Sequence, residues 1–550
     1  MMIYIDTNAI AGRLPERSCN QMKSGFLNMG IFRFLFYSQL VILAFAVLFV
    51  AVAPLAVTAG DNDKQTDEVL RRVIKQAKKL YQTGNLEESE NLLRGNVERS
   101  PQNTASRLEL AYVLLKQNKL SEAASISFEI AKADPKNSFA FAVLGSTHLN
   151  AGNLMEAKAL FIQSLTLNKK EALAWAGFGM LDFYENRIEE SIDKLYTAGF
   201  YDPDEPEFIF TLAQVLARDE RYSEAADAYD RFLSLSPSIE TNKRNLIKGL
   251  ASFLRYLNDQ RSLYDLEGSA RTSVKFELVK ERPVIELLVN GKEKPLRFII
   301  DTGSGISIIS KTAAAQLGVK PVTRGGQSNA IGGLGQFDVV YGFLKSVQIG
   351  DIRVKNVPVY IREINPGSEI DGHIGLSLIS KFLTVIDYGN MTFSLTKRNA
   401  ADKTTPENDN DISLLLRRTS SGFLSGEVQL DGVEGAWNFI VDTSAGMSVI
   451  SDKFAELIEA GRYLREEKIR VVGAGGAIDG VQSFLLPRII LGDSDDNTRE
   501  RVTAISLNLD SINEASGFQQ SGILGANFLK NFRLTFDFKD SKVIFTPLQR

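Results

Sequence analysis

The chain has very few residues of the kinds that bind transition metals or act as soft nucleophiles. Its 550 residues include a single cysteine, Cys19, and only two histidines, His148 and His373. One cysteine cannot form an internal disulfide, and a Cys–His catalytic pair or a His/Cys zinc site is excluded in practice. Neither histidine has a ligand partner at metal spacing, so we expect both to be structural. No metal and no cofactor is expected, and carboxylates are left as the candidate catalytic groups.

The charge balance excludes a further class of function. Lys and Arg total 63 and Asp and Glu total 67, which gives a formal net charge of −4, and no long run of one sign occurs. Such a balance gives no reason to expect nucleic acid or another polyanion as a ligand. Charged residues make up 24% of the chain and hydrophobic residues 44%, which is ordinary for soluble globular protein. The length predicts several domains.

Residues 1–60 are predicted to be an export signal or a single membrane anchor. The stretch Val41–Val57 is almost wholly apolar, and basic residues precede it at positions 13, 17, 23 and 33. This order of charges places the amino end inside the cytoplasm and all that follows outside it. Val57-Thr58-Ala59 resembles a signal-peptide cleavage site, whereas the apolar stretch also fits an uncleaved anchor that would contact the membrane. Met22 and Met29 are alternative starts. In either case we expect an exported protein, periplasmic or membrane-anchored, with its domains outside the cytoplasm.

A 34-residue period runs from residue 70 to about residue 240, within a predicted solenoid domain at 70–258. Five similar phrases, each 34 residues after the last, begin with GNLEES at position 84 and end with ERYSEA at position 220. Proline recurs on the same period at positions 101, 135, 203 and 237, where it would end a helix, and Lys169 fills the vacant position. The pattern resembles tetratricopeptide repeats (TPR), in which pairs of helices stack into a solenoid. We expect about five repeats, then a solvated cap helix over Asn242–Leu257 and a linker at 259–272.

A solenoid of this kind presents a concave groove that binds an extended peptide or a partner protein. The periodic residues define the helix packing, so they are expected to be core. Groove positions would come from other residues of the first helices, and Asn150 and Tyr184 lie near the ends of two of them. The predicted partner of this region is therefore a peptide or protein held in the groove.

Two short segments farther along the chain are near copies of one another. FIIDTGSGISIIS begins at Phe298 and FIVDTSAGMSVIS begins at Phe439, and eight of their thirteen positions are identical. Each segment ends an apolar strand with an aspartate and follows it with a turn of small residues. Two copies of one turn, each delivering one carboxylate, are what a shared pair of carboxylates requires. The sequence therefore predicts that Asp301 and Asp442 face each other.

These segments resemble the half-sites of aspartic proteases, specifically the retropepsin-like group. Ala330–Gly335 resembles the glycine-rich flap tip of that family, and Val472–Gly476 lies at a similar distance after the second aspartate. The apolar-Gly segments Ile374-Gly375-Leu376 and Ile523-Leu524-Gly525 resemble the one that packs behind the catalytic turn. Strand, turn, flap and Gly segment thus occur in order and twice.

The resemblance implies a role for each matching residue. Asp301 and Asp442 would form the catalytic dyad, in which two nearby carboxylates share one proton and titrate together. The turn residues Thr302, Gly303, Thr443 and Ser444 would form the scaffold of that dyad. Flap glycines would let hairpins close over an extended substrate, at positions Gly332, Gly333, Gly335, Gly473, Gly475 and Gly476.

From Ser273 onwards the hydrophobic period changes from that of helices to that of strands. A turn is predicted at Asn290-Gly291, and short helices after each Asp turn, over Lys311–Leu317 and Asp452–Ala460. Two retropepsin-like lobes are expected at 273–397 and 412–550, joined by a polar linker at 398–411. The predicted fold is multidomain, with an N-terminal all-α TPR solenoid followed by mostly-β tandem lobes that form a single-chain pseudo-dimer.

Ser444 is the departure from the family pattern that bears most on activity, because the family has Gly there. An added side chain could displace Asp442, or its hydroxyl could donate to the carboxylate and favour the charged form. Three hypotheses follow. The first is an exported aspartic-type endopeptidase whose TPR domain binds substrate or a partner. The second is a non-catalytic peptide-binding or scaffold protein with a degenerate protease-like region. The third is an active site formed by two first lobes across a homodimer.

Overall fold

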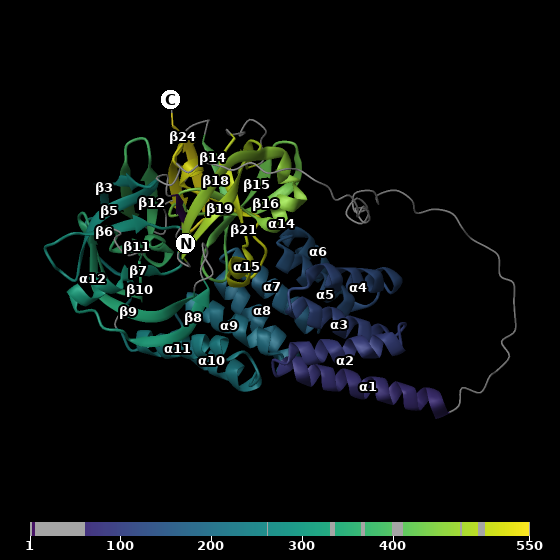
Figure 1. Ribbon diagram of the computed structural model, residues 1–550. Helices are drawn as coiled ribbons and strands as arrows, with labels where there is room; N and C mark the ends of the chain where they lie inside the picture. The colour runs from purple at the N-terminus through teal and green to yellow at the C-terminus, as the bar shows by residue number, and fades with distance from the viewer. Residues whose placement is uncertain are drawn as a thin grey trace. The chain divides into compact units, whose positions relative to one another are not determined.

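The computed structural model describes residues 3–5, 61–260, 262–329, 336–364, 369–398, 411–473, 476–492 and 501–548. Leu70–Arg550 form one compact unit together with the first six residues (Figure 1). The predicted signal or anchor at 41–57, the linker residues 399–410 and the flap residues Gly332, Gly333, Gly335 and Gly475 lie outside the described residues. No helix in the described ranges is long and apolar enough to cross a membrane.

The first part of the described chain is a helical solenoid with the predicted period. The second helices of the repeats begin at residues 86, 120, 154, 188 and 222, each 34 residues after the last. The fold class, an α-helical solenoid followed by mostly-β lobes, is therefore confirmed. The helices are α1 (Asp61–Gln82), α2 (Leu86–Arg99), α3 (Thr104–Lys116), α4 (Leu120–Ala133), α5 (Ser138–Ala151), α6 (Leu154–Leu167), α7 (Ala172–Tyr184), α8 (Ile188–Tyr201), α9 (Pro206–Arg218), α10 (Tyr222–Leu235) and α11 (Thr241–Asn258).

Small residues set the spacing of these helices. A Cβ added at Gly177 of α7 would lie 2.1 Å from the ring of Phe161 on α6, so only glycine leaves room for that ring. In the next helix pair, the hydroxyl of Ser191 donates to the carbonyl oxygen of Gly179 at 2.7 Å and joins α8 to α7. Close packing of this kind is sensitive to single methylene groups.

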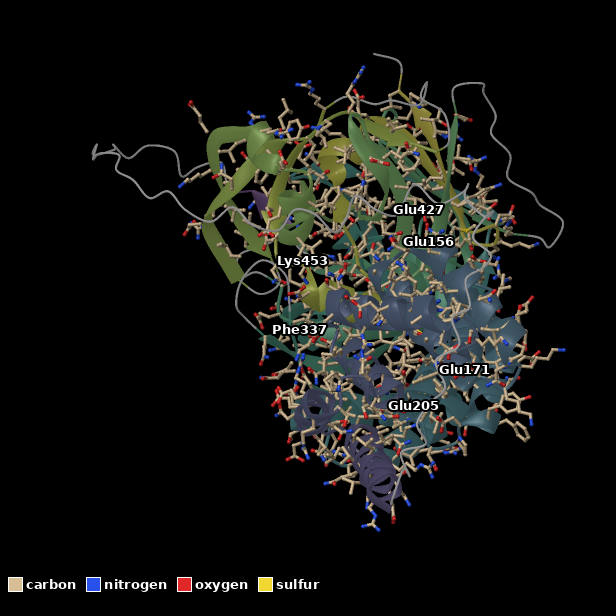
Figure 2. All side chains as sticks on the ribbon, turned by 90° about the vertical axis from the view of Figure 1, so that its right-hand side faces the viewer. Glu156, Glu171, Glu205, Phe337, Glu427 and Lys453 are labelled. Atoms are coloured by element: carbon tan, nitrogen blue, oxygen red, sulfur yellow. The ribbon has the colours of Figure 1, made fainter. Side chains whose placement is uncertain are left out.

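Residues from distant repeats meet on the inner side of the solenoid. Lys116 of α3 forms an ion pair at 2.6 Å with Glu205, which precedes α9 and is labelled in Figure 2. The two side chains are 8% and 2% exposed. The amide of Ser238, after α10, donates to the carbonyl oxygen of Thr83, after α1, at 2.9 Å. Residues of distant repeats are therefore in direct contact with one another.

The helix predicted to be a solvated cap is covered by protein instead. The side chain of Asn242 on α11 accepts a hydrogen bond from the amide of Gln327 and donates to its carbonyl oxygen, both at 2.7 Å. A Cβ on Gly249 would lie 2.3 Å from the Cα of Gly325, so two glycines bring α11 against the backbone of β8 (Thr323–Asn329). The predicted linker is also partly structured, because Asp265–Gly268 form β2 and pair with β10.

The first lobe is built on β5, β6 and β9, with β11 inserted between β6 and β7. Asn290 and Gly291 have φ values of 53° and 71° and make the predicted turn between β5 and β6. The lobe contains β3 (Arg271–Lys275), β4 (Glu277–Val279), β5 (Arg282–Val289), β6 (Leu296–Ile300), β7 (Ser307–Ser310), α12 (Lys311–Leu317), β9 (Gln336–Ile349), β10 (Ile352–Arg362), β11 (Gly372–Ile374), α13 (Leu376–Ile379), β12 (Phe382–Asp387) and β13 (Thr392–Lys397).

The second lobe repeats this arrangement. Its helix α14 ends at Leu457 rather than at the predicted Ala460, because Glu459 adopts a left-handed conformation with φ of 50°. The lobe contains β14 (Ile412–Arg418), β15 (Leu424–Leu430), β16 (Val433–Val441), β17 (Ser448–Ser451), α14 (Asp452–Leu457), β18 (Leu464–Gly473), β19 (Gly476–Leu485), β20 (Ile489–Leu491), β21 (Thr503–Leu507), α15 (Asp510–Ser516), β22 (Gly522–Leu524), α16 (Ala526–Leu529), β23 (Phe532–Asp537) and β24 (Lys542–Pro547).

A sheet shared by both lobes joins them. β12 of the first lobe pairs antiparallel with β23 of the second, with Thr384 opposite Phe536 and Asp387 opposite Arg533. β13 and β24 flank this pair, and one hydrophobic core contains buried residues of both lobes, including Phe393 and Phe545. The two lobes are therefore a single folding unit within one chain, as the pseudo-dimer prediction requires.

Arg218, at the end of α9, connects the solenoid to the second lobe. Its guanidinium carbon lies 3.7 Å from the ring centre of Phe183, and the group donates to the carbonyl oxygens of Arg418, Thr419 and Ser420. Burial lowers the pKa of Arg218 well below its ordinary value, so these acceptors are what offset the loss of water around the cation.

The two residues proposed as groove positions contact the same lobe. The hydroxyl of Tyr184 donates to the carbonyl oxygen of Gly517 at 3.2 Å, and the carbonyl oxygen of Asn150 accepts from the amide of Gln519 at 2.9 Å. A Cβ on Gly517 would lie 2.4 Å from the Tyr184 hydroxyl, so the fit is tight. These residues bind the chain itself.

Replacing Arg218 by alanine should loosen the solenoid from the second lobe. It removes the hydrogen bonds from the guanidinium to the carbonyl oxygens of residues 418–420, and a hydrogen bond to a charged group contributes about 1.5–3 kcal/mol. We expect a lower urea midpoint of unfolding and faster proteolytic cleavage near residues 418–420. Arg221→Ala is the matched control, because Arg221 pairs with Glu224 at the surface and should matter little. Equal effects of the two substitutions would contradict this account.

Candidate active site

Equivalent strands place the two aspartates. Asp301 follows β6, and its amide donates to the carbonyl oxygen of Ile374 at 3.0 Å; Asp442 follows β16, and its amide donates to that of Leu524, also at 3.0 Å. In both lobes the Asp-bearing strand runs parallel to the strand of the apolar-Gly segment, with Ile374 opposite Ile300 and Leu524 opposite Val441. The duplicated sequence thus has a duplicated structure down to the register of its strands.

The two Asp turns are joined by reciprocal hydrogen bonds of their threonines. The hydroxyl of Thr302 donates to the carbonyl oxygen of Val441 at 2.8 Å, and that of Thr443 donates to the carbonyl oxygen of Ile300 at 2.7 Å. Each hydroxyl also accepts from the other turn's amide, at 3.0 Å and 3.2 Å. All four groups are buried, so these bonds set the distance between the turns.

Gly303 lies directly against the second carboxylate. A Cβ built on Gly303 would be 2.2 Å from Oδ2 of Asp442, a distance that no side chain permits. The amide of Gly303 at the same time donates to Oδ1 of Asp301 at 2.9 Å. One residue therefore touches both carboxylates, which the structure brings together within a single chain, with no exposed area on either.

Asp301 accepts hydrogen bonds on both of its oxygens. Besides the Gly303 amide on Oδ1, the hydroxyl of Ser304 donates to Oδ2 at 2.7 Å, and Nδ1 of His373 lies 2.7 Å from the same oxygen. The pKa of the Asp301 carboxyl lies below its ordinary value: burial raises it, and the hydrogen bonds from His373 and Ser304 are among the interactions that lower it.

Asp442 has a different set of partners. Its Oδ1 accepts from the amide and the hydroxyl of Ser444, both at 2.8 Å, and from the amide of Ala445 at 3.2 Å. Its Oδ2 has no hydrogen-bond partner among the described residues. Burial and the charge of Asp301 raise the pKa of Asp442 to about 6, against the lowering effect of Ser444. Ser444 therefore fits beside Asp442 as a hydrogen-bond donor.

Two hairpins correspond to the predicted flaps. β8 and β9 form the first, and β18 and β19 form the second, where Gly473 pairs with Gly476. Gly476 has a φ of 120°, which favours glycine. Next to the first hairpin, the guanidinium of Arg362 lies 4.4 Å from the ring of Phe337 on β9 (Figure 2), and its charge interacts with Asp301.

Sequence reasoning missed two partners of Asp301. His373 was expected to be only structural, yet it contacts the carboxylate, because β11 lies beside the end of β6. Ser304 was seen as a turn residue and not as a donor. Only the position of His373, directly before the apolar-Gly segment, could have pointed to that contact. In the described ranges there is no cluster of three or more His, Cys, Asp or Glu that could hold a metal ion.

Comparison with known protein families agrees with both halves of this architecture. Residues 285–378, which include Asp301 and His373, match the family model described as aspartyl protease. Residues 74–138 and 176–238 match the tetratricopeptide repeat model. The chain thus contains an aspartyl protease-like domain and tetratricopeptide repeats, which generally mediate contacts between proteins.

Solved structures resemble the chain only in part, and no curated protein matches it. A thermophilic TPR protein of Thermus thermophilus is 18% identical over 31% of this chain and 92% of its own, with a TM-score of 0.27. The pilF protein of Pseudomonas aeruginosa is 17% identical over 36% of this chain and 86% of its own, with a TM-score of 0.26.

Thr302→Val should weaken the link between the two turns while preserving side-chain shape. It removes the donor to Val441 and leaves the amide of Thr443 without its acceptor, at about 1–3 kcal/mol for each buried group. We expect a lower urea midpoint of unfolding. Thr302→Ser keeps the hydroxyl and is the control. Wild-type stability in the valine variant would show that the hydroxyl network is not what holds the turns.

Proposed function

We propose that this protein is an aspartic-type endopeptidase that cleaves peptide bonds through Asp301 and Asp442. The observation that carries the proposal is the pair of Asp turns, joined by Thr302 and Thr443 within one chain. The two carboxyl groups also differ in environment. That of Asp301 favours the ionised form, and that of Asp442 favours the protonated form. This pairing of Asp301 with Asp442 in one chain speaks against an active site formed by two first lobes.

The different environments assign a role to each carboxyl group. Asp301, the better hydrogen-bonded group, is the ionised member and takes a proton from a bound water, whose oxygen attacks the peptide carbonyl carbon. Asp442 carries its proton on the unpartnered Oδ2 and donates it to the carbonyl oxygen. The resulting tetrahedral intermediate collapses when Asp301 passes its proton to the amide nitrogen, Asp442 takes a proton back from a hydroxyl group, and the carbon–nitrogen bond breaks. Neither carboxylate forms a covalent bond with substrate.

An extended polypeptide is the substrate that this site would accept. The extended segment β1 (Ile3–Ile5) pairs antiparallel with β18, with Ile3 opposite Gly473 and Ile5 opposite Val471. The edge of the second flap hairpin therefore has the hydrogen-bonding pattern for a strand of peptide. Main-chain pairing of this kind is largely independent of side-chain identity.

Export and a protein partner remain parts of the proposal. The basic residues before the apolar stretch Val41–Val57 support placing the domains outside the cytoplasm, in the periplasm or on a membrane anchor. The tetratricopeptide repeats support a protein partner or a protein substrate held by the solenoid. The contacts of Asn150 and Tyr184 with the second lobe favour the outer helices over the inner positions as the surface for such a partner.

A peptide-binding protein without catalysis is the second candidate. Ser444 favours it, because that residue departs from the family pattern at a position beside Asp442. The complete burial of both carboxyl groups agrees with it as well. A cleavage assay separates the two candidates, since binding alone leaves an unfolded protein substrate intact.

Asp301→Asn and Asp442→Asn should each abolish cleavage of an unfolded protein substrate such as reduced casein. Each variant removes one of the two proton-transfer groups, which typically contribute about 10²–10⁴-fold to a rate. Residues 60–550 would be assayed from pH 3 to 7 by the appearance of new amino termini. Loss of cleavage only with Asp301→Asn would favour pairing between chains. No cleavage by folded wild-type protein at any pH would favour the peptide-binding candidate.

The alkaline limit of activity should report Asp442. Its carboxyl group must be protonated to donate, so activity should fall as the pH rises through about 6. Ser444→Gly removes a hydrogen bond that lowers this pKa, and we expect the alkaline limit to move to higher pH. Ser448→Gly, at a hydroxyl that bonds to Asn527, is a control for loss of a nearby buried hydroxyl. An unchanged alkaline limit in Ser444→Gly would assign that limit to another group.

A further inference from the structure

His373 is a fully buried imidazole that lies in direct contact with Asp301. It is the middle residue of β11, whose register places it opposite Ile299 of β6 and Ile308 of β7. Neither His373 nor Asp301 has any exposed side-chain area, and Nδ1 of the imidazole lies 2.7 Å from Oδ2 of the carboxylate. The proposed mechanism gives this residue no role, although it touches one of the two reacting groups.

The surroundings of His373 favour a neutral ring. Ile299 and Ile308 belong to a small buried apolar cluster with Val284, Ile364 and Ile370. Burial lowers the pKa of His373 despite the hydrogen bond to Asp301, and the charge of Arg282 on β5 lowers it further. A neutral imidazole has one N–H, and an ionised carboxylate can only accept, so the proton must be on Nδ1. Nε2 then has a lone pair and no hydrogen-bond partner among the described residues.

Several other charged groups lie near this contact. Arg362 of β10 acts on Asp301 from the flap side. Asp371, two residues before His373, accepts from the amide of Arg297 at 2.9 Å. Asp442 is the remaining carboxyl group, and it interacts with Asp301 across the two lobes. The imidazole is therefore the neutral donor that reaches Asp301 from behind the turn.

The second lobe shows that the fold does not require a histidine here. Ile523 occupies the equivalent position in β22, opposite Ile440 and Val449 as His373 is opposite Ile299 and Ile308. An isoleucine therefore fits between these strands. A buried polar ring in place of isoleucine carries a desolvation cost without a packing advantage. Its hydrogen bond to Asp301 is what distinguishes the two lobes.

We propose that His373 is a positioning residue that donates its Nδ1 proton to Oδ2 of Asp301 and so fixes Asp301 as the ionised member of the pair. This proposal rests on the proposed protease function. Hydrogen bonds to the charged form of a carboxyl group favour that form, so the bond should keep Asp301 ionised to lower pH. It also leaves the shared proton on Asp442, whose Oδ2 faces no other donor among the described residues.

A matched pair of substitutions tests the role. His373→Ile reproduces the second lobe and removes the donor. His373→Asn keeps one, because the Asn Nδ2 occupies nearly the place of the imidazole Nδ1. We expect the acid limit of kcat/KM to rise by about one to two pH units in His373→Ile, as for the loss of a hydrogen bond to a charged group. It should stay near the wild-type value in His373→Asn, and the alkaline limit should hardly move in either variant.

A purely structural role predicts a different pattern. Both variants would then lower kcat equally at every pH, or lower the melting temperature without moving the acid limit, and either result would overturn the proposal. If the wild-type protein is active and the pH limits of kcat/KM in His373→Ile equal those of the wild type, the proposal is overturned too. Inactive wild-type protein would instead contradict the proposed protease function, and the positioning role of His373 with it.

Nuclear magnetic resonance gives a readout that does not need activity. The chain has only two histidines, so an untagged, ¹⁵N-labelled protein shows two imidazoles, and the half-buried His148 serves as the internal reference. We expect a slowly exchanging Nδ1 proton from His373 that is lost in Asp301→Ala. A His373 ring that titrates like a free imidazole, or that carries its proton on Nε2, would overturn the proposal.

Discussion

The reciprocal hydrogen bonds of Thr302 and Thr443 are the constraint on which the rest of the site depends. The two residues are 141 positions apart, so no local turn can fix the distance between the aspartates that precede them. Each hydroxyl uses its single proton on a carbonyl oxygen of the other lobe and accepts from that lobe's amide. A movement of either turn would break several buried hydrogen bonds at once, which makes the arrangement cooperative.

Within this symmetric framework the two carboxyl groups have different partners. Gly303 and Ser304 in the first turn correspond to Ser444 and Ala445 in the second, so each turn has one serine hydroxyl, and the two are offset by one position. The first hydroxyl donates to Oδ2 of Asp301, and the second donates to Oδ1 of Asp442. With the contact of His373, both oxygens of Asp301 have hydrogen-bond partners. One oxygen of Asp442, Oδ2, has no donor among the described residues. Three differences in sequence thus give two identical side chains different hydrogen-bond partners.

The sequence was sufficient to predict most of the fold and the pairing of the aspartates. The 34-residue period sets the helix boundaries because each repeat is one packing unit, and the duplicated Asp segments must form the same turn because they share its residues. The contact of His373 was beyond prediction, since it depends on which strand is inserted between β6 and β7. The cover over α11 was missed for a related reason: the glycines that permit it, Gly249 and Gly325, belong to different domains and have no local signature.

The contacts of the solenoid assign it a part in the fold of the protease-like lobes. Arg218 holds the start of the second lobe, and Asn242 pairs with the backbone of Gln327 in the strand that leads to the first flap. Asn242 offers that strand one donor and one acceptor, as a neighbouring strand would. These two hydrogen bonds hold β8 against α11 at Gln327. A solenoid that only recruited partners would need none of these contacts, and making them costs conformational freedom that a flexible tether would keep.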